Sequence, residues 1–573
     1  MGIIPKRGDI SMKKLIACLL TLALTASLMI PMASAAGYTD VPAASSLAGE
    51  VQKAVDYGLM NGYNATTFGY SDTMTRAQFV TVLDRMFGWP APFGEKLSVY
   101  ITAGMEISED ISDTYYQAIA HASCYDVIDR FVPFRPNDPI TRGEMAEMLV
   151  RALGLKSTAS GLNSNRMFPG SDMTQHTPFT DLPDGNEGYI SIAYTIGMTK
   201  GTSDTTFSPN ATATRAQAAA MLVRMYEKLH QKTNFVHGFY AISSYSQLDL
   251  AEEMDAVSAG WSRMTWDGNT ALLATTSANG NEYAIPSGYE SVTEALAGKL
   301  NLSVFMEGQS LQNMLASESG RAQAVEQIVS ELSVTYKAIG KNPYSGVTID
   351  FEGFGRANRD AFTAFLSALD KEVEKLNKSL YVCVAPVPLG SSVYECAYDY
   401  KTIGTLADKV ILMAHDYDPR NLDTYVNGPG DVGKYYENCP TAPLNSIYLD
   451  LRDVTEQVDP AKVVLAFSVR SIAWQIDENG YLVSGKPVSV SPETVVKRLS
   501  QPDTEKGWDA TYQQPYAIYT TEDGSRYFLW YQDDESVETA LNAAKLMGVT
   551  GVSIWRLGII PQYASYDWSG LLK

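Results

Sequence analysis

The sequence predicts a multidomain protein with two fold classes. The first part should be an all-α set of helical repeats, and the second an α/β barrel of eight strand–helix units, a (β/α)8 or TIM barrel with a small α+β insertion. Three observations support this prediction. Similar helix-forming segments occur three times in the first 230 residues. After them, short apolar β-rich runs alternate with helical segments. The chain, at 573 residues, is long enough for several domains.

The predicted domain boundaries follow these changes of pattern. They are a signal peptide over 1–35, helical repeats over 38–90, 98–156 and 177–230, and the barrel over 234–571. A linker rich in Ser and Asn is expected over about 156–177, between the second and third repeats.

The N-terminus has the pattern of a secretion signal. Lys13 and Lys14 precede an apolar run over 15–30, and the Ala-Ser-Ala at 33–35 offers a cleavage site. No later apolar run reaches the roughly 18 residues expected of a transmembrane helix. We therefore expect an exported protein that is either free outside the cell or held at the cell wall by something it binds.

The composition argues against several classes of partner. The chain has 65 Asp and Glu against 44 Lys and Arg, a net charge of −21, which disfavours nucleic acid and anionic membrane surfaces. The histidines are scattered and the cysteines fit no metal motif, so we expect no metal and no cofactor. Cys383, within an apolar run, is expected in the core rather than in a ligand set.

The three repeats share the start of their second helix. A Thr stands at the expected N-cap and a Gln or Glu follows three residues later, which is the pattern of a capping box. The pairs are Thr75 with Gln78, Thr141 with Glu144, and Thr214 with Gln217.

An Arg follows each capping Thr, and capping does not explain it. Arg76, Arg142 and Arg215 place a cation in the first helical turn, where the helix dipole disfavours it. One interpretation is a salt bridge to a neighbouring repeat. The other is a set of guanidinium groups that bind an anionic polymer.

These repeats resemble the surface-layer homology (SLH) modules of bacterial envelope proteins. The resemblance rests on the tetrads TRAQ, TRGE and TRAQ and on the TDV and TDL openings at Asp40 and Asp181. It implies that the modules bind an anionic secondary cell-wall polymer, through Arg76, Arg142 and Arg215 together with Asp40 and Asp181. The second repeat lacks a clear TDV or TDL opening.

Eight apolar runs predict the barrel strands. They begin near residues 236, 255, 301, 346, 380, 409, 462 and 551. Helices are expected over 322–339, 359–376 and 535–547, and the insertion over about 471–531. In such a barrel the active site lies at the C-terminal ends of the strands.

The run YSGVTIDFEGF, over 344–354, alternates with a period of two. Thr348, Asp350 and Glu352 fall on one side of the strand. Two carboxyl groups this close raise one pKa, which would let one of them serve as a general acid at neutral pH. The alternative is an ordinary strand end that is exposed to solvent.

The barrel sequence resembles glycoside hydrolase family 18, and within it the branch of spore-cortex and cell-wall hydrolases. The strand-four signature of that family corresponds to 345–352, and the strand-six signature to Met413-Ala-His415-Asp416-Tyr417. Trp555 corresponds to the Trp that ends strand eight. The segments NRDAFTAFLSALDKEV, AKVVLAFSVRSIAW and FLWYQDDESVETALNAAKLMGVTGVSIWRLG are similar to the hydrolase branch.

The resemblance implies a substrate-assisted, retaining mechanism on glycans that contain N-acetylglucosamine, such as peptidoglycan or a chitin-like polymer. Glu352 would be the acid, Asp350 would orient the acetamido group, and His415 and Asp416 would complete the catalytic set. Trp555, Tyr417 and Met413 would bind substrate.

Two residues depart from the pattern of the family. Thr348 replaces an Asp beneath Asp350, and His415 replaces a Tyr that binds the acetamido oxygen. The alternative to a wall-anchored hydrolase is therefore a catalytically weak or inactive envelope protein whose barrel only binds glycan.

Overall fold

The computed structural model describes residues 37–89, 113–129, 132–164, 177–276, 283–387 and 396–561. The chain divides into two compact units, Met1–Met145 with Asn210–Tyr226, and Ala146–Pro209 with Glu227–Lys573. The predicted signal peptide and the expected start of the second repeat lie outside the described residues. Within the described ranges, no helix has the length and apolar character needed to cross a membrane.

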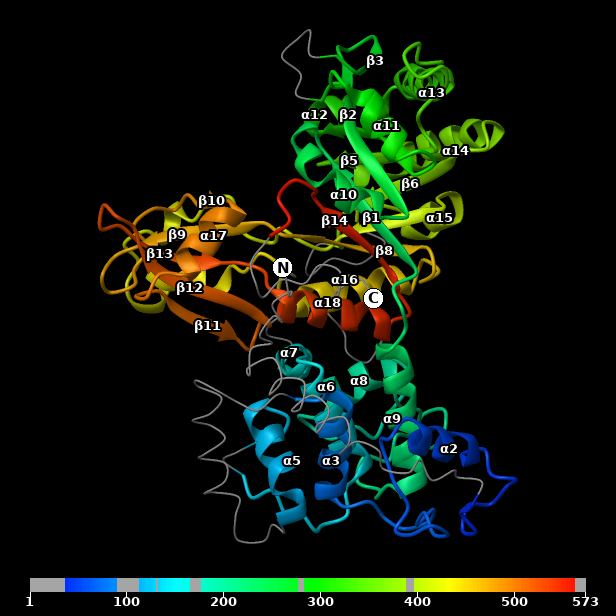
Figure 1. Cartoon of the computed structure of the whole chain (residues 1–573), viewed down its shortest axis with the longest axis vertical. Coiled ribbons are helices and arrows are strands. Elements are labelled where there is room, and N and C mark those ends of the chain that lie inside the picture. Colours follow the sequence, from blue (N-terminus) through cyan, green and yellow to red (C-terminus); the bar gives the residue numbers. More distant parts are fainter. Residues whose placement is uncertain are drawn as a thin grey trace, which may run out of the picture. The chain divides into compact units, whose positions relative to one another are not determined.

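Each repeat contributes two successive helices, as predicted. They are α2 (Ala48–Asp56) and α3 (Arg76–Phe87), α5 (Asp113–Cys124) and α6 (Arg142–Ala152), and α8 (Glu187–Thr195) and α9 (Arg215–Leu229) (Figure 1). All three predicted capping boxes form. In the first, Gln78 N donates to Thr75 Oγ1 at 3.3 Å and Thr75 N donates to Gln78 Oε1 at 3.1 Å. The same reciprocal bonds join Thr141 to Glu144 and Thr214 to Gln217.

The expected linker over 156–177 begins with a helix instead. Lys156–Ser164 forms α7, which packs against α8. The segment is mostly polar, but its two apolar residues Ala159 and Leu162 are at helical spacing and are buried. Burial of one face therefore outweighs the loop-forming tendency of Ser and Asn.

All eight predicted strands form a closed parallel barrel. They are β1 (Phe235–Tyr240), β2 (Ala256–Trp266), β4 (Leu300–Glu307), β5 (Gly346–Glu352), β6 (Ser379–Val384), β7 (Lys409–Met413), β8 (Val463–Ser468) and β14 (Gly551–Trp555) (Figure 1). The order is β1-β14-β8-β7-β6-β5-β4-β2, and pairing of β1 with β2 closes the ring. A ninth strand, β3 (Ala271–Ala274), extends the sheet as an antiparallel neighbour of β2.

The strands are linked by η3 (Ile242–Gln247) and by helices of very different lengths. These helices are α10 (Leu248–Glu252), α11 (Tyr289–Ala295), α12 (Gly308–Ala316), α13 (Glu318–Ser333), η5 (Arg356–Asn358), α14 (Arg359–Lys375), α15 (Tyr400–Leu406), α16 (Leu444–Thr455) and α18 (Asp534–Leu546). α14 and α18 match the predicted ranges. The helix expected over 322–339 is α13, which begins earlier and ends at Ser333. Its end is fixed by Asn342, whose Nδ2 donates to the carbonyl oxygens of Glu331 and Val334, both at 2.8 Å.

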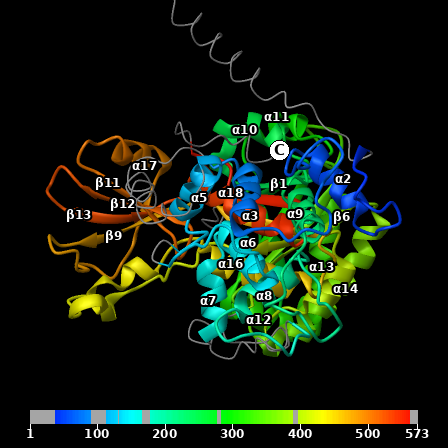
Figure 2. The ribbon, with the colours of Figure 1, turned by 90° about the horizontal axis from the view of Figure 1, so that it is seen from below.

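The insertion is a five-stranded antiparallel sheet, in the order β10-β9-β13-β12-β11. It comprises β9 (Ser471–Ile476), β10 (Val488–Val490), α17 (Pro492–Leu499), β11 (Glu505–Asp509), β12 (Gln514–Thr520) and β13 (Arg526–Trp530), which Figure 2 shows as one group of orange ribbons. Its core also takes Leu422, Tyr436 and Cys439 from the loop between β7 and α16, which carries η6 (Asp423–Tyr425) and η7 (Gly430–Asn438). Two segments of the chain therefore build this small domain, and the sequence predicted one of them.

Candidate functional site

Strand β5 carries the predicted carboxyl pair into the barrel. Val347, Ile349 and Phe351 are buried on the outer face, where Phe351 stacks on Phe365 of α14 at 5.3 Å between ring centroids. On the inner face Asp350 is only 4% exposed, while Glu352 at the strand end is half-buried. The alternative of a solvent-exposed strand end is therefore wrong for Asp350.

The two carboxyl groups compete for protons. Burial, with repulsion from Glu352, raises the pKa of Asp350 to about 8. Burial also raises the pKa of Glu352, and the nearby charge of Glu307 adds to this rise. Because two negative charges side by side in a poorly solvated site are costly, the pair holds a proton at neutral pH. A half-buried carboxyl that retains a proton is suited to general-acid chemistry.

Cys383 of β6 is the neighbour of Asp350. Its thiol is fully buried in the barrel interior, as expected of a core residue, and it also hydrogen-bonds the Asp350 carboxyl. Burial and the two nearby carboxyl groups raise the pKa of Cys383, so the thiol keeps its proton. Asp350 Oδ1 is buried without a hydrogen-bond partner among the described residues.

Beneath the carboxyl pair, four strands are joined by a chain of hydrogen bonds between fully buried side chains. His237 of β1 contacts Ser553 Oγ of β14 through Nδ1 and Ser258 Oγ of β2 through Nε2, both at 2.7 Å. Ser258 Oγ lies 2.6 Å from Thr348 Oγ1 of β5. Burial lowers the pKa of His237 to about 3, so the whole network is uncharged. Thr348 thus places a neutral, bonded hydroxyl beneath Asp350.

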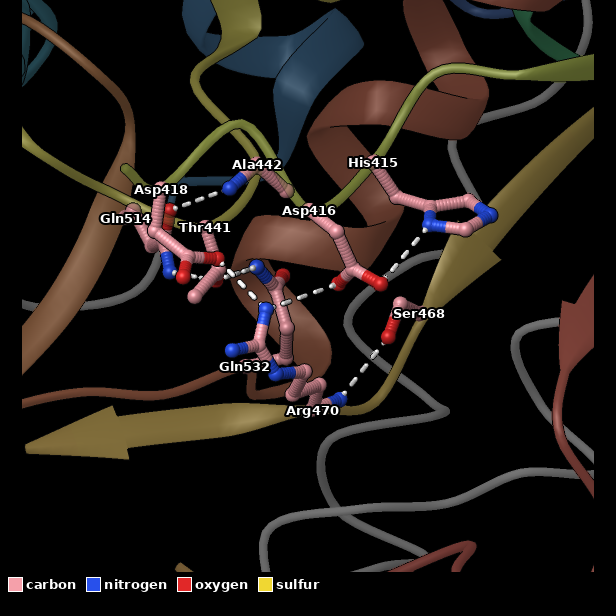
Figure 3. Close-up of polar contacts among 9 residues, drawn as sticks. All are labelled: His415, Asp416, Asp418, Thr441, Ala442, Ser468, Arg470, Gln514 and Gln532. Atoms are coloured by element: carbon pink, nitrogen blue, oxygen red, sulfur yellow. Dashed lines mark hydrogen bonds and ion pairs between the residues drawn. The ribbon is translucent and has the colours of Figure 1, made fainter. Parts of the chain in front are cut away.

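The end of β7 brings His415 and Asp416 to the same side of the barrel. His415 Nδ1 lies 3.3 Å from Asp416 Oδ2 (Figure 3). Burial opposes ionisation of Asp416, but His415, Arg470 and Ser468 hold its pKa below the usual value. Asp416 has a φ of 57°, so the chain turns sharply directly after His415.

Arg470, which the sequence analysis missed, fixes this turn. Its Nη1 lies 2.8 Å from Asp418 Oδ1 and 3.9 Å from Asp416 Oδ1, and its backbone N–H donates to Ser468 Oγ at 3.1 Å (Figure 3). The Asp418 side chain is nearly inaccessible to solvent, so its carboxylate needs a cation beside it, and Arg470 is that cation. Asp416 and Asp418 follow the predicted strand two residues apart, which indicates that a cation is needed there but does not identify it.

The predicted substrate-binding residues have different surroundings. Trp555 is half-buried at the end of β14 and packs edge-on against Phe239 at 5.2 Å between centroids. Met413 is half-buried at the end of β7 and packs against the interior cluster of the barrel. The hydroxyl of Tyr417 donates to Asp450 of α16, so it ties the loop to a helix.

The aspartates of the two TDV and TDL openings hold loops. Asp40 accepts hydrogen bonds from the backbone N–H groups of Phe68, Gly69 and Tyr70 at 2.7–2.9 Å. Although burial opposes its ionisation, these donors hold the pKa of Asp40 below its usual value. Asp181 accepts in the same way from the residues at 207 and 208. Both carboxylates therefore order the aromatic loop of their own repeat.

Arg76 and Arg215 reach the loop of another repeat. Arg76 Nε donates to the carbonyl oxygen of Phe134 at 2.6 Å, and its Nη1 pairs with Glu144. Arg215 donates to the carbonyl oxygens of Phe68 at 3.0 Å and Asn61 at 2.8 Å. These contacts match the salt-bridge interpretation for Arg76. The third arginine, Arg142, donates from its backbone N–H to Ala211.

A pocket of about 170 Å³ lies beside Arg215. Its polar lining comprises Asn61, Tyr63, Gln78, Thr81, Arg85, Tyr115 and Arg215. The Arg215 guanidinium lies over the Tyr63 ring at 4.6 Å, and the Arg215 residue is only 6% exposed. The pocket therefore combines two guanidinium groups with aromatic side chains, a lining suited to an anionic sugar.

A (β/α)8 barrel with a proton-sharing carboxyl pair at a strand end has the arrangement of a glycoside hydrolase. The sequence model described as "Glycosyl hydrolases family 18" matches residues 207–559, more than half of the chain. The chain therefore belongs to glycosyl hydrolases family 18. The model described as "S-layer homology domain" matches residues 37–80, 126–146 and 178–219.

Curated relatives include a lytic enzyme and an S-layer protein. The chain is 25% identical over 297 residues to the "Cortical fragment-lytic enzyme" of Bacillus subtilis (strain 168), which covers 49% of this chain and 62% of the relative. It is 27% identical over 226 residues to the "S-layer protein EA1" of Bacillus anthracis, covering 39% and 24%. The chain spans about half the length of the curated hydrolase relatives it matches.

Solved structures similar to the second part include the spore cortex-lytic enzyme SleL of Bacillus megaterium QM B1551. That likeness has a TM-score of 0.46 and 16% identity, and covers 58% of this chain and 72% of the other. A family 18 N-acetylglucosaminidase from Paenibacillus barengoltzii matches with a TM-score of 0.41 and 17% identity, covering 59% and 98%.

Proposed function

We propose that this protein is a cell-wall-anchored hydrolase of N-acetylated glycans, of the peptidoglycan or chitin-like class. The observation that carries the proposal is the Asp350 and Glu352 pair, one carboxyl buried and one half-buried at the barrel mouth, with the pKa of each raised by burial. A related protein is described as a cortical fragment-lytic enzyme and a solved family member as an N-acetylglucosaminidase, which favours this substrate class.

In the proposed mechanism, Glu352 protonates the glycosidic oxygen and the leaving sugar departs. The acetamido carbonyl of the substrate attacks the anomeric carbon, so no enzyme nucleophile is required. Asp350 accepts a hydrogen bond from the acetamido nitrogen through a carboxyl oxygen that carries no proton, and so orients the acetamido group. Glu352 then removes a proton from the water that opens the intermediate, with net retention of configuration.

We assign supporting roles to the residues around the pair. His415 donates from its free ring nitrogen to the acetamido oxygen, and Asp416, held ionised by Arg470, orients the imidazole. Trp555, Met413 and Tyr417 form the walls of the sugar subsite. In the SLH modules, we assign binding of the anionic cell-wall polymer to Arg76, Arg142, Arg215, Asp40 and Asp181. These residues either contact the polymer or order the loops that contact it.

Replacing Glu352 with Gln tests the catalytic proposal. The variant keeps the shape of the side chain but has no proton to give, so we expect kcat to fall by about 10²–10⁴. Products from N-acetylglucosamine oligomers and purified peptidoglycan are measured by mass spectrometry. Glu318→Gln, which removes the same charge from an exposed position on α13, is the matched control and should keep wild-type turnover. Equal product from wild type and Glu352→Gln would sink the proposal.

The alternative is an envelope protein whose barrel binds glycan without cutting it. The bonded hydroxyl of Thr348 beneath Asp350, and the imidazole in place of a phenol at His415, favour this reading. It predicts oligosaccharide binding by both wild type and Glu352→Gln, and turnover by neither. Turnover that disappears in Glu352→Gln rules it out.

A further inference from the structure

The neighbouring strand places a third carboxyl group beside the candidate acid. Strands β4 and β5 pair in parallel with Phe305 opposite Asp350 and Glu307 opposite Glu352. Register partners in a parallel sheet point to the same face, and adjacent strands are about 4.8 Å apart. Because Asp350 faces the barrel interior, Glu307 and Glu352 both project at the barrel mouth, side by side.

The surroundings of Glu307 and Glu352 differ in burial and in their position relative to a helix. Glu307 is exposed, whereas Glu352 is half-buried. Glu307 is also the N-cap residue of α12, where the helix dipole favours a negative charge. The Glu307 side chain accepts no capping hydrogen bond from the first turn of α12. Glu352, not Glu307, is therefore the member of the pair whose pKa is raised by burial.

We propose that Glu307 is a positioning residue of the general acid, whose charge on the adjacent strand keeps the proton on Glu352 until the glycosidic oxygen takes it. Only the Glu352 proton moves, from its carboxyl oxygen to the glycosidic oxygen, and Glu307 takes no part in the transfer. This inference rests on the proposed function, which supplies the acid role of Glu352.

Other charged and titratable groups face Glu352 from every side of the site. They are Asp350 from β5, Cys383 from β6, Tyr398 from the segment after β6, and His415, Asp416 and Arg420 from the loop after β7. His415 and Arg420 favour ionisation of Glu352, whereas Asp416 opposes it. After burial, repulsion from Glu307 is the largest influence that raises the pKa of Glu352. Glu307 thus offsets the influence of His415 and Arg420, which lower the pKa of Glu352.

Replacing Glu307 with Gln tests the inference through the pH dependence of kcat, which reports groups in the enzyme–substrate complex. Loss of the charge should move the alkaline limb of the profile to lower pH by about 0.5–1 unit. The plateau at lower pH should change by less than about twofold, because Glu352 is protonated there in both proteins. Glu307→Asp retains the charge and should keep the limb near its wild-type position.

Glu318→Gln is again the matched control, because it removes one exposed carboxylate near a helix N-terminus without facing Glu352. A shift in Glu307→Gln no larger than in this control overturns the inference. Raising the salt concentration should shrink the difference between wild type and Glu307→Gln, since the repulsion crosses a solvent-exposed region.

Infrared titration gives a second measurement that does not need turnover. The infrared carboxyl band that disappears in Glu352→Gln reports the titration of Glu352. When the same comparison is made with Glu307→Gln present in both proteins, this band should titrate at lower pH. A Glu352 titration that Glu307→Gln leaves in place overturns the inference. A protein with no turnover on any N-acetylated glycan overturns the proposed function instead, so the two failures are distinguishable.

Discussion

Asp350 is a carboxyl group whose ionisation is opposed by its place in the fold. It is almost fully buried, one oxygen has no hydrogen-bond partner among the described residues, and its pKa is raised to about 8. A group whose folded pKa exceeds its unfolded value binds more protons in the native state between the two values. Stability therefore falls as pH rises through that window.

The Asp350→Asn variant tests this sign. Asn cannot ionise, so it removes the penalty that wild type meets between about pH 4 and 8. We expect the Tm of the variant relative to wild type to be several degrees higher at pH 8 than at pH 5. Calorimetric scans at both pH values measure it. The Asp450→Asn variant is a useful comparison. Asp450 has a similarly raised pKa, but it lies on α16, outside the carboxyl pair. A Tm difference that is the same at both pH values would contradict the assignment.

Individual site residues differed in how far the sequence could locate them. Asp350 and Glu352 were found because a strand has a period of two, so their spacing alone put them on one face. Glu307 and Arg470 were missed, because their roles depend on which strands are neighbours and in what register. Pairing across the barrel is set by closure of the whole sheet and leaves no local pattern. Each lies at the end of a predicted strand, which was the available signal.

At the scale of elements, the predictions held where a local rule decides. The capping boxes and eight strands follow from hydrogen-bonding patterns and apolar runs that each segment carries by itself. The ends of α13 and the existence of α7 do not. The side chain of Asn342, which lies beyond the end of α13 in the sequence, fixes that end, and packing against α8 orders α7, a segment with loop composition. Both effects are tertiary, and both override local propensity.

The hydrogen-bonded chain of His237, Ser258 and Thr348 makes a prediction at this scale, because it joins separate strands. Ser258→Ala leaves a buried ring nitrogen and a buried hydroxyl without a partner, so the barrel should lose about 1–3 kcal/mol. Thr348→Val, combined with Ser258→Ala, should cost less than the sum of the two single changes. Urea unfolding followed by Trp fluorescence measures all three. Strict additivity would mean that the 2.6 Å contact carries no coupling.

At the scale of the whole molecule, the sequence separates two tasks between an N-terminal set of SLH repeats and a family 18 barrel. The predicted functions of the two parts use opposite charges. The barrel site is built from carboxyl groups, whereas the pocket beside Arg215 carries guanidinium groups and aromatic rings. A protein with a net charge of −21 would be repelled by an anionic polymer, so any retention must come from such a local cationic pocket.

Arg215→Ala should therefore weaken binding to cell-wall sacculi by about tenfold or more, since a charge-assisted contact is worth about 1.5–3 kcal/mol. Arg76→Ala should weaken it too, through the loop that Arg76 holds. Because Arg215 also bonds the loop of the first repeat, Tyr63→Ala provides a variant that is safer for folding. Tyr63 lines the same pocket and is 52% exposed.

Arg135→Ala is the matched control, because it removes an arginine that is 60% exposed from the same unit without entering the pocket. Sacculi stripped of their secondary polymer by acid should retain none of these proteins. Hydrolysis of soluble oligosaccharides should be unchanged in Arg215→Ala, because the carboxyl pair is untouched. Undiminished pull-down of Arg76→Ala, Arg215→Ala and Tyr63→Ala together would refute the ligand role, and would leave the tetrad arginines as residues that only join one repeat to the next.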